Sequence, residues 1–218
     1  MKCVLIVFCF ILVGCESSTA TNDQSEMQEI CGRNDHSNLE RLPVYRAKVP
    51  RTWQRKDPEP SVSIEDTKTA LCEFTIPDEK QQIKIVIHNF PLMEGKSIPP
   101  MAQIARWRNQ FSVIDQTATK IIPQAYSGFV GYLLEASEQE NPSAVMAWAL
   151  QIAPEHHATL NYHWKIAEAS HDKRMLHQMM ADLTIKATGS KQLLKKFRRD
   201  IINFARSIEL IQEIPESP

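Results

Sequence analysis

The sequence of 218 residues has little of several residue types that define particular classes of protein. Its 6 glycines exclude a collagen-like repeat, and 13 prolines are too few for a chain that is disordered throughout. Its 5 cysteines are too few for a disulfide scaffold, and none stands in a Cys-x-x-Cys pair, so neither a zinc ribbon nor a thioredoxin-like redox site is encoded. The formal net charge of −1 lacks the basic excess of nucleic-acid-binding proteins, so we expect no nucleic acid partner.

Sequence motifs of the common enzyme classes are also missing. There is no GxSxG, HExxH, Walker A or GxGxxG pattern. Ser170, His171 and Asp172 are adjacent in the chain and cannot fold back into a catalytic triad. The sequence therefore predicts that the protein is not an enzyme, while an unrecognised envelope hydrolase stays open as an alternative because catalytic groups assemble in space.

The amino-terminal segment carries the strongest signal in the chain. After Lys2, the apolar run from Cys3 to Val13 is too short to span a bilayer but has the length of a signal-peptide core. The end of this run, Leu12 to Cys15, resembles the lipobox of bacterial lipoproteins. The resemblance implies that residues 1–14 are a signal peptide cleaved between Gly14 and Cys15. It also implies that Cys15 receives a lipid anchor, through a diacylglyceryl group on the thiol and a further acyl chain, such as palmitate, on the amine.

The segment that follows the lipobox predicts a membrane tether. Residues 15–41 are rich in Ser, Thr, Asn, Asp and Glu, as expected of a flexible, lipidated linker. Two acyl chains hold a protein stably at a membrane, so we expect a membrane-anchored protein on the exported side of a bacterial membrane. Glu16 leaves open whether that membrane is the inner or the outer one. Export permits a disulfide between Cys31 and Cys72, but the sequence also allows two free thiols.

Hydrophobic periodicity predicts one α+β domain over residues 42–213, followed by a short tail over 214–218. Alternating apolar residues indicate strands, and apolar residues at steps of three and four indicate helices. A central antiparallel sheet flanked by helices is the expected architecture. The predicted strands cover residues 44–48, 70–76, 83–90, 126–135, 144–152 and 181–188, and the predicted helices cover 100–111 and 194–211.

The order of apolar and turn positions resembles a known family. Val49 to Trp53, Leu71 to Pro77, Ile104 to Phe111 and Asp182 to Gly189 follow one another as in uncharacterised bacterial lipoproteins with a PsbP-like domain. The resemblance implies an α/β/α sandwich and no agreed reaction. Because PsbP-like relatives act in photosystem assembly or bind protein partners, it favours a binding or structural module of the cell envelope, with an envelope protein as a partner.

Residues 154–180 are an insertion relative to that pattern and hold five of the seven histidines. Neutral imidazole is a common ligand of zinc and copper, so a metal-binding domain is an alternative function. The spacing does not favour a ready-made site, because a six-residue step on a helix does not return to the same face. Structural or solvated histidines are therefore favoured. The candidate ligands are His156, His157, His163, His171 and His177.

The last predicted helix is strongly basic on its outer surface. Its cations lie away from the apolar stripe, which is typical of a solvated face. The functional alternative is contact with anionic lipid headgroups or an acidic partner near the membrane. The candidate residues are Lys191, Lys195, Lys196, Arg198 and Arg199.

Overall fold

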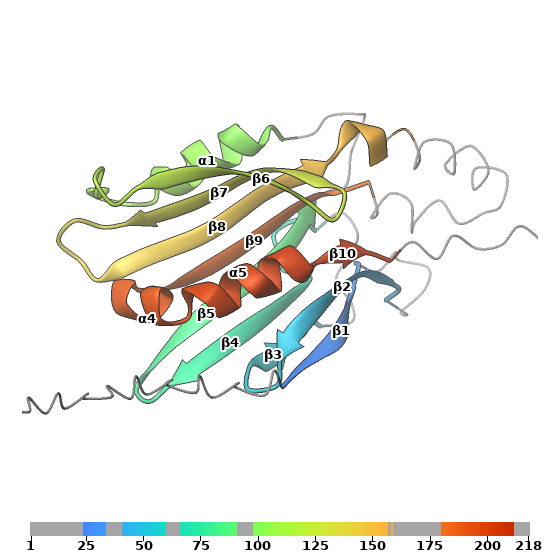
Figure 1. Ribbon diagram of the computed structural model, residues 1–218, viewed down its shortest axis with the longest axis horizontal. Helices are drawn as coiled ribbons and strands as arrows, with labels where there is room; N and C mark the ends of the chain where they lie inside the picture. Colours follow the sequence, from blue (N-terminus) through green and yellow to red (C-terminus); the bar gives the residue numbers. More distant parts are fainter. Residues whose placement is uncertain are drawn as a thin grey trace, which may run out of the picture.

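The structure, a computed structural model, describes residues 24–33, 41–59, 66–90, 98–156, 158 and 180–211. Within these ranges, ten strands form two antiparallel sheets, and three helices pack against them (Figure 1). The larger sheet has seven strands in the order β3-β4-β5-β9-β8-β7-β6. Its strands are β3 (Gln54–Lys56), β4 (Cys72–Asp78), β5 (Gln81–Phe90), β6 (Lys120–Tyr126), β7 (Phe129–Ser137), β8 (Ser143–Ile152) and β9 (Asp182–Ser190).

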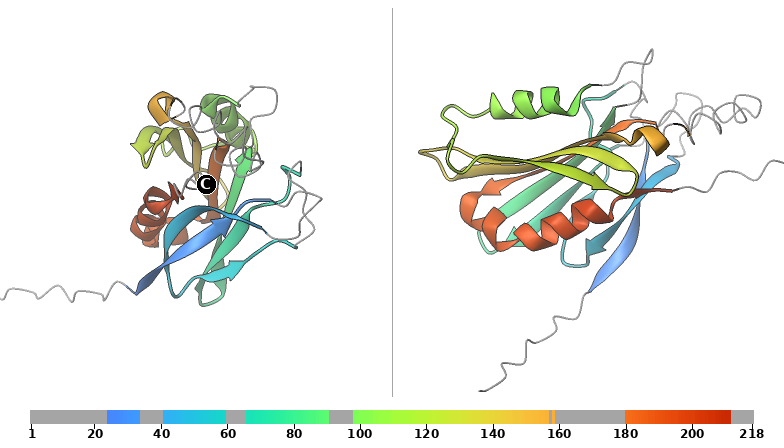
Figure 2. Two further views of the ribbon diagram at one scale, coloured as in Figure 1. Left: turned by 90° about the vertical axis from the view of Figure 1, so that its right-hand side faces the viewer. Right: turned by 45° about the horizontal axis from the view of Figure 1, so that its top comes forward.

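The smaller sheet joins the two ends of the described chain. It has the order β1-β2-β10, with β1 (Ser25–Cys31), β2 (Pro43–Pro50) and β10 (Glu209–Leu210). The helices are α1 (Pro100–Arg108), α4 (Lys191–Lys196) and α5 (Arg198–Ser207). Figure 2 shows α1 on one side of the large sheet, and α5 with the small sheet on the other. In the described residues, no helix has both the length and the apolar character that a membrane crossing needs.

The main core lies between the large sheet, α5 and the small sheet. Strand alternation points Ile83, Ile85 and Ile87 of β5 into it, and all three are fully buried. Phe204 of α5 packs there against Trp53, with ring centroids 5.1 Å apart. The largest fully buried side chains of this core are Trp148, Tyr45, Phe74, Phe129 and Phe204. The predicted central antiparallel sheet is therefore confirmed.

A second, smaller core lies on the opposite face of the large sheet. Ile104 and Trp107 of α1 pack there on β7 and β8. The sheet residues beneath the helix are small, including Ala147 and Ala149, so the helix can approach closely. Because α1 is nine residues long and lies over β7 and β8, it leaves the same face of β5 and β9 uncovered. Polar side chains such as Lys84, His88 and Lys186 stand on this uncovered face.

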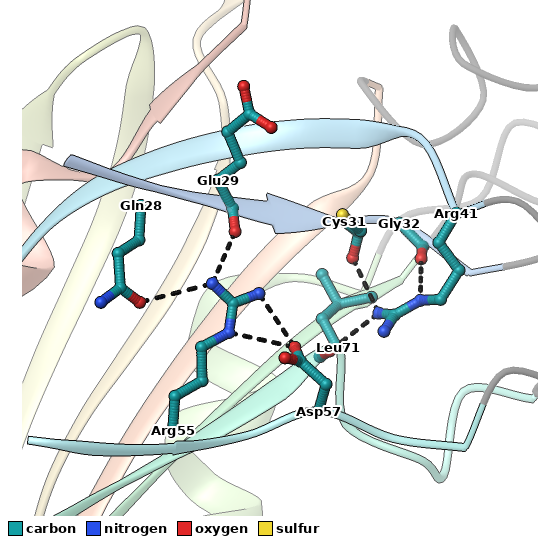
Figure 3. Close-up of polar contacts among 8 residues, drawn as sticks. All are labelled: Gln28, Glu29, Cys31, Gly32, Arg41, Arg55, Asp57 and Leu71. Carbon is teal, nitrogen blue, oxygen red and sulfur yellow. Dashed lines mark hydrogen bonds and ion pairs between the residues drawn. The ribbon is translucent and has the colours of Figure 1, made fainter.

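The prediction that residues 15–41 are a flexible tether is wrong for the part that is described. Ser25 to Cys31 form β1, which pairs antiparallel with β2, and Ile30 of this strand is fully buried. Arg41 donates hydrogen bonds to the carbonyl oxygens of Gly32, Cys31 and Leu71 at 2.8–3.0 Å, which ties the end of β1 to the start of β4 (Figure 3). The folded domain therefore begins about 17 residues before the predicted boundary at residue 42.

A second arginine fastens the same strand from the side of the large sheet. Arg55 donates to the carbonyl oxygen of Glu29 at 2.8 Å and pairs with the Asp57 carboxylate at 2.9 Å (Figure 3). Since Arg55 belongs to β3, this contact joins the edges of the two sheets. Both arginines satisfy backbone carbonyls that pairing between strands leaves free.

Two further predictions are corrected by turns and helix ends. The predicted strand 126–135 begins at Phe129 instead, because Ser127 and Gly128, both with positive φ, form a two-residue turn that joins it to β6, a strand that was not predicted. The predicted helix 194–211 breaks at Phe197 and ends at Ser207. Beyond it, Glu209 and Leu210 pair with β2 instead of continuing the helix.

Candidate functional site

Of the predicted metal ligands, the structure describes His156 alone. Cys15 and Gly14 lie outside the described residues, as do His157, His163, His171 and His177. His156 follows the end of β8, and its ring lies 3.1 Å from where a Cβ on Gly128 would stand, so it packs on the β6–β7 turn. Within the described ranges, no three His, Cys, Asp or Glu side chains gather where they could hold a metal ion. Zinc or copper binding by the insertion stays a prediction.

The predicted basic surface is partly neutralised by intramolecular partners. Lys196 lies 2.6 Å from the Asp78 carboxylate, and Arg198 lies 2.6 Å from that of Glu135. Both pairs are exposed, so each contributes at most about 1 kcal/mol to stability. Lys195 and Arg199 are exposed, and Lys191 is half-buried. The five cations thus do not form a continuous field of unpaired charge, and their contact with an anionic surface stays a prediction.

Cys31 and Cys72 are both free thiols in the structure. Cys72 is fully buried in β4, and burial raises the pKa of its thiol to about 12. Burial also raises the pKa of the half-buried Cys31. Thiols with raised pKa values are poor nucleophiles, so neither cysteine is a candidate for covalent chemistry.

A cleft of about 470 Å³ lies beside α1 and is the candidate site. We call it the α1 cleft. Its floor is the outer face of β5, β9 and β8, where Lys84, Thr188 and Val145 stand opposite one another across the three strands. Its wall is the chain that leaves α1, at Gln110 and Phe111. The volume is in the range of small-molecule sites, which span about 300–1,000 Å³.

Lys186 is the chemically distinctive group of the α1 cleft. It projects from the middle of β9, is half-buried, and donates a hydrogen bond of 2.5 Å to the amide oxygen of Gln110. Burial, and secondarily the guanidinium of Arg106 on α1, lower the pKa of its ammonium. No carboxylate of the described chain is among the groups that perturb it. Lys186 is therefore a partly desolvated cation whose direct partner is a neutral amide.

The other charged groups of this face are already compensated or stand apart from Lys186. The Lys84 ammonium lies 2.8 Å from the Glu73 carboxylate, diagonally across β5 and β4. Glu138 lines the cleft, and its carboxylate accepts a hydrogen bond of 3.1 Å from the backbone amide of Ser112. That contact fixes the chain after α1. Among the charged residues that line the cleft, Lys186 is thus the lysine without a charged partner in the ion pairs described here.

His88 extends the same polar face toward the other end of β5. It is half-buried, and its ring stacks on that of Phe90 with centroids 6.2 Å apart. Burial and the nearby guanidinium of Arg33 lower the pKa of His88. Arg106 acts in the same direction and Glu73 in the opposite one. The imidazole is therefore held neutral to lower pH than an exposed histidine.

A buried polar cluster near His88 has a structural role. Arg33 is almost fully buried. Its guanidinium donates hydrogen bonds to the backbone and side-chain oxygens of Asn89 and to the carbonyl oxygen of Thr69, the last at 2.8 Å. Burial lowers the pKa of Arg33 to about 10 and raises that of the fully buried Tyr45. The Arg33 guanidinium joins the chain just after β1 to the end of β5. Arg41 and Arg55 likewise fasten β1 to other parts of the fold.

The α1 cleft was not predicted from the sequence. Its residues come from β5, β8, β9 and the segment that follows α1, which are separated by up to about a hundred positions in the chain. The one available signal is alternation, which places Lys84 and His88 on the outward face of the predicted strand 83–90. No local pattern shows that Lys186 and Gln110 meet on this face.

Comparisons with known proteins give one weak structural match to report. No protein-family model matches the chain, and no curated protein matches it. Among solved structures, the chain is similar to the solution structure of cyanobacterial PsbP (CyanoP) from Synechocystis sp. PCC 6803. The TM-score is 0.46 and the sequence identity 10%, over 88% of this chain and 95% of that one.

Proposed function

We propose that the chain is a binding module, held on the exported side of a bacterial membrane by acyl chains on Cys15, and that its ligand enters the α1 cleft. The observation that carries this proposal is Lys186, a half-buried ammonium in a cleft of about 470 Å³ whose hydrogen bond goes to the neutral amide of Gln110. The lipobox-like end of residues 1–14 supports the anchor.

The physical reason for a binding role is the cost of burying charge. Removing an ammonium from water is unfavourable unless an opposite charge or several hydrogen bonds offset it. Lys186 is half-buried, and its hydrogen bond goes to the neutral amide of Gln110. A partly buried charge that costs stability in this way is expected where the residue binds a ligand.

The anchor is tested by substituting the lipidated residue. Cells expressing the full chain or its Cys15→Ser variant are labelled with radioactive palmitate and fractionated. We expect label and membrane attachment for the natural chain, and neither for Cys15→Ser. Labelled, membrane-bound Cys15→Ser protein would refute the anchor and leave the cleft unaffected.

The cleft is tested by filling it. Thr188 is half-buried on the floor, so Thr188→Trp places a large ring in the cleft without entering either core. Thr75→Trp, on the same sheet face but outside the lining, is the matched control. Native mass spectrometry of protein extracted from membranes should show a bound small molecule that is retained by the control and lost in Thr188→Trp. Equal spectra for all three chains would overturn the proposed binding role of the cleft.

A further inference from the structure

Opposite charges line the α1 cleft, and both contact one short segment of chain, residues 110–112. The amide oxygen of Gln110 accepts a hydrogen bond of 2.5 Å from the Lys186 ammonium. The backbone amide of Ser112 donates one of 3.1 Å to the Glu138 carboxylate. Two residues of chain span at most about 7 Å, so the ammonium and the carboxylate meet this segment at points that a small molecule can bridge.

The two charges do not neutralise each other in the described part of the chain. The ion pairs of this face include Lys84 with Glu73 at 2.8 Å but not Lys186 with Glu138. Each of the latter two has a neutral partner instead, so the ammonium keeps two N–H donors and the carboxylate keeps its second oxygen. Because partly buried charges cost stability without a countercharge, a ligand that brings both countercharges offsets both costs together.

We propose that the α1 cleft binds a small zwitterion, a free amino acid or a short peptide, whose carboxylate meets Lys186 and whose ammonium meets Glu138. This inference rests on the proposed function, because it names the ligand chemistry of the same cleft. Phe111 lines the cleft between the two contact points and supplies an apolar surface for the side chain of the ligand. The cleft thus offers three different kinds of contact to one molecule.

The experiment is a titration with ligands in which one charge at a time is blocked. The full chain carrying Cys15→Ser, which removes the lipid anchor, is titrated at low ionic strength and pH 7 with leucine and with leucyl-leucine. Each probe is also used in its N-acetyl form, which lacks the ammonium, and as its carboxamide, which lacks the carboxylate. Backbone amide NMR signals of Ser112, Lys186 and Thr188 report on the cleft. We expect saturable shifts with at least one unblocked probe, and binding about tenfold or more weaker for both of its blocked forms.

Substitutions assign each charge of the ligand to its partner. In Lys186→Gln, the unblocked probe and its carboxamide should bind within about twofold of each other, because the partner of the carboxylate is gone. In Glu138→Gln, the unblocked probe and its N-acetyl form should become equal for the same reason. Lys120→Gln and Glu140→Gln remove exposed charges outside the cleft lining and should keep the full discrimination. Unchanged amide signals of the core residues show that each variant is folded.

Each outcome decides the inference. The tighter binder of the two unblocked probes assigns a free amino acid or a short peptide. Failure of both probes to saturate the signals, or equal binding of blocked and unblocked forms to the unsubstituted cleft, overturns the zwitterion assignment.

The proposed function can stand when this inference fails. That is the result if a small molecule retained by the membrane-extracted protein is lost in Thr188→Trp but carries no ammonium or no carboxylate. If no molecule is lost in Thr188→Trp, the proposed function itself fails.

Discussion

Substitution of Ile30 tests whether β1 belongs to the folded domain. Ile30 is the fully buried residue of β1 and pairs in register with Tyr45 of β2. Ile30→Ala removes three carbon atoms at about 0.8 kcal/mol each, or about 2.4 kcal/mol. The remaining cavity adds to this, so the expected loss of unfolding free energy is about 3 kcal/mol.

Urea denaturation of the full chain carrying Cys15→Ser measures this loss, with the slope m checked for each variant. Met27→Ala is the matched control, because Met27 lies in the same strand and its side chain is 57% exposed. We expect the control to change the unfolding free energy by less than about 0.5 kcal/mol. If Ile30→Ala also stayed within about 0.5 kcal/mol, residues 24–33 would behave as a tether and the reasoning would be refuted.

Three further outcomes are expected. Gly131→Ala should cost more than about 3 kcal/mol by urea denaturation, because its Cβ would lie 2.0 Å from the backbone oxygen of Ala149; a smaller loss would show that β7 and β8 can move apart. Folding lowers the pKa of His88, so the unfolded chain binds more protons than the folded one, and the free energy of unfolding should fall as pH drops below about 6.5. His88→Gln should remove this contribution to the pH dependence of stability. An unchanged pH dependence in His88→Gln would refute the burial of the imidazole. Asp78→Asn removes the exposed partner of Lys196 and should change stability by less than about 1 kcal/mol in the same assay.

The large sheet could be predicted because its strands carry a strong local pattern. In β5, Ile83, Ile85 and Ile87 alternate with polar residues, and the observed burial alternates in the same way. In β8, a continuous apolar run from Val145 to Leu150 matches a strand covered on both faces, by α1 and by the main core. The pattern of apolar residues predicts β5 and β8 because the burial of those residues determines where the strands form.

Strands β1 and β6 were not predicted, because their formation depends on partners that lie outside a short window of sequence. β1 has a single fully buried residue, and it is held by β2 and by Arg41 and Arg55, so its own composition resembles a linker. β6 contains Pro123 and lies at the edge of the sheet, where a missing backbone donor is tolerated. Neither feature has a signal within a short window of sequence.

The broken last helix shows how periodicity can be right about a face and wrong about an element. Leu194 of α4 and Ile201 and Phe204 of α5 all enter the main core, so apolar spacing continues across the break at Phe197. Ile208 is also buried there, but it follows the helix and leads into β10. The spacing records which residues face the core, and strand pairing with β2 decides where the helix stops.

The shortness of α1 links the fold to the proposed binding site. A helix that covered the whole outer face would require apolar residues on β5 and β9 as well as on β7 and β8. Because α1 ends at Arg108 and covers β7 and β8, the outward positions of β9 are free to carry Lys186 and Thr188. The chain leaving the helix then bends back at Gln110, where it meets Lys186 and closes one wall of the cleft. Ligand binding in the α1 cleft would therefore depend on where α1 ends, and an extension of the helix over β9 would remove the proposed site while leaving the main core intact.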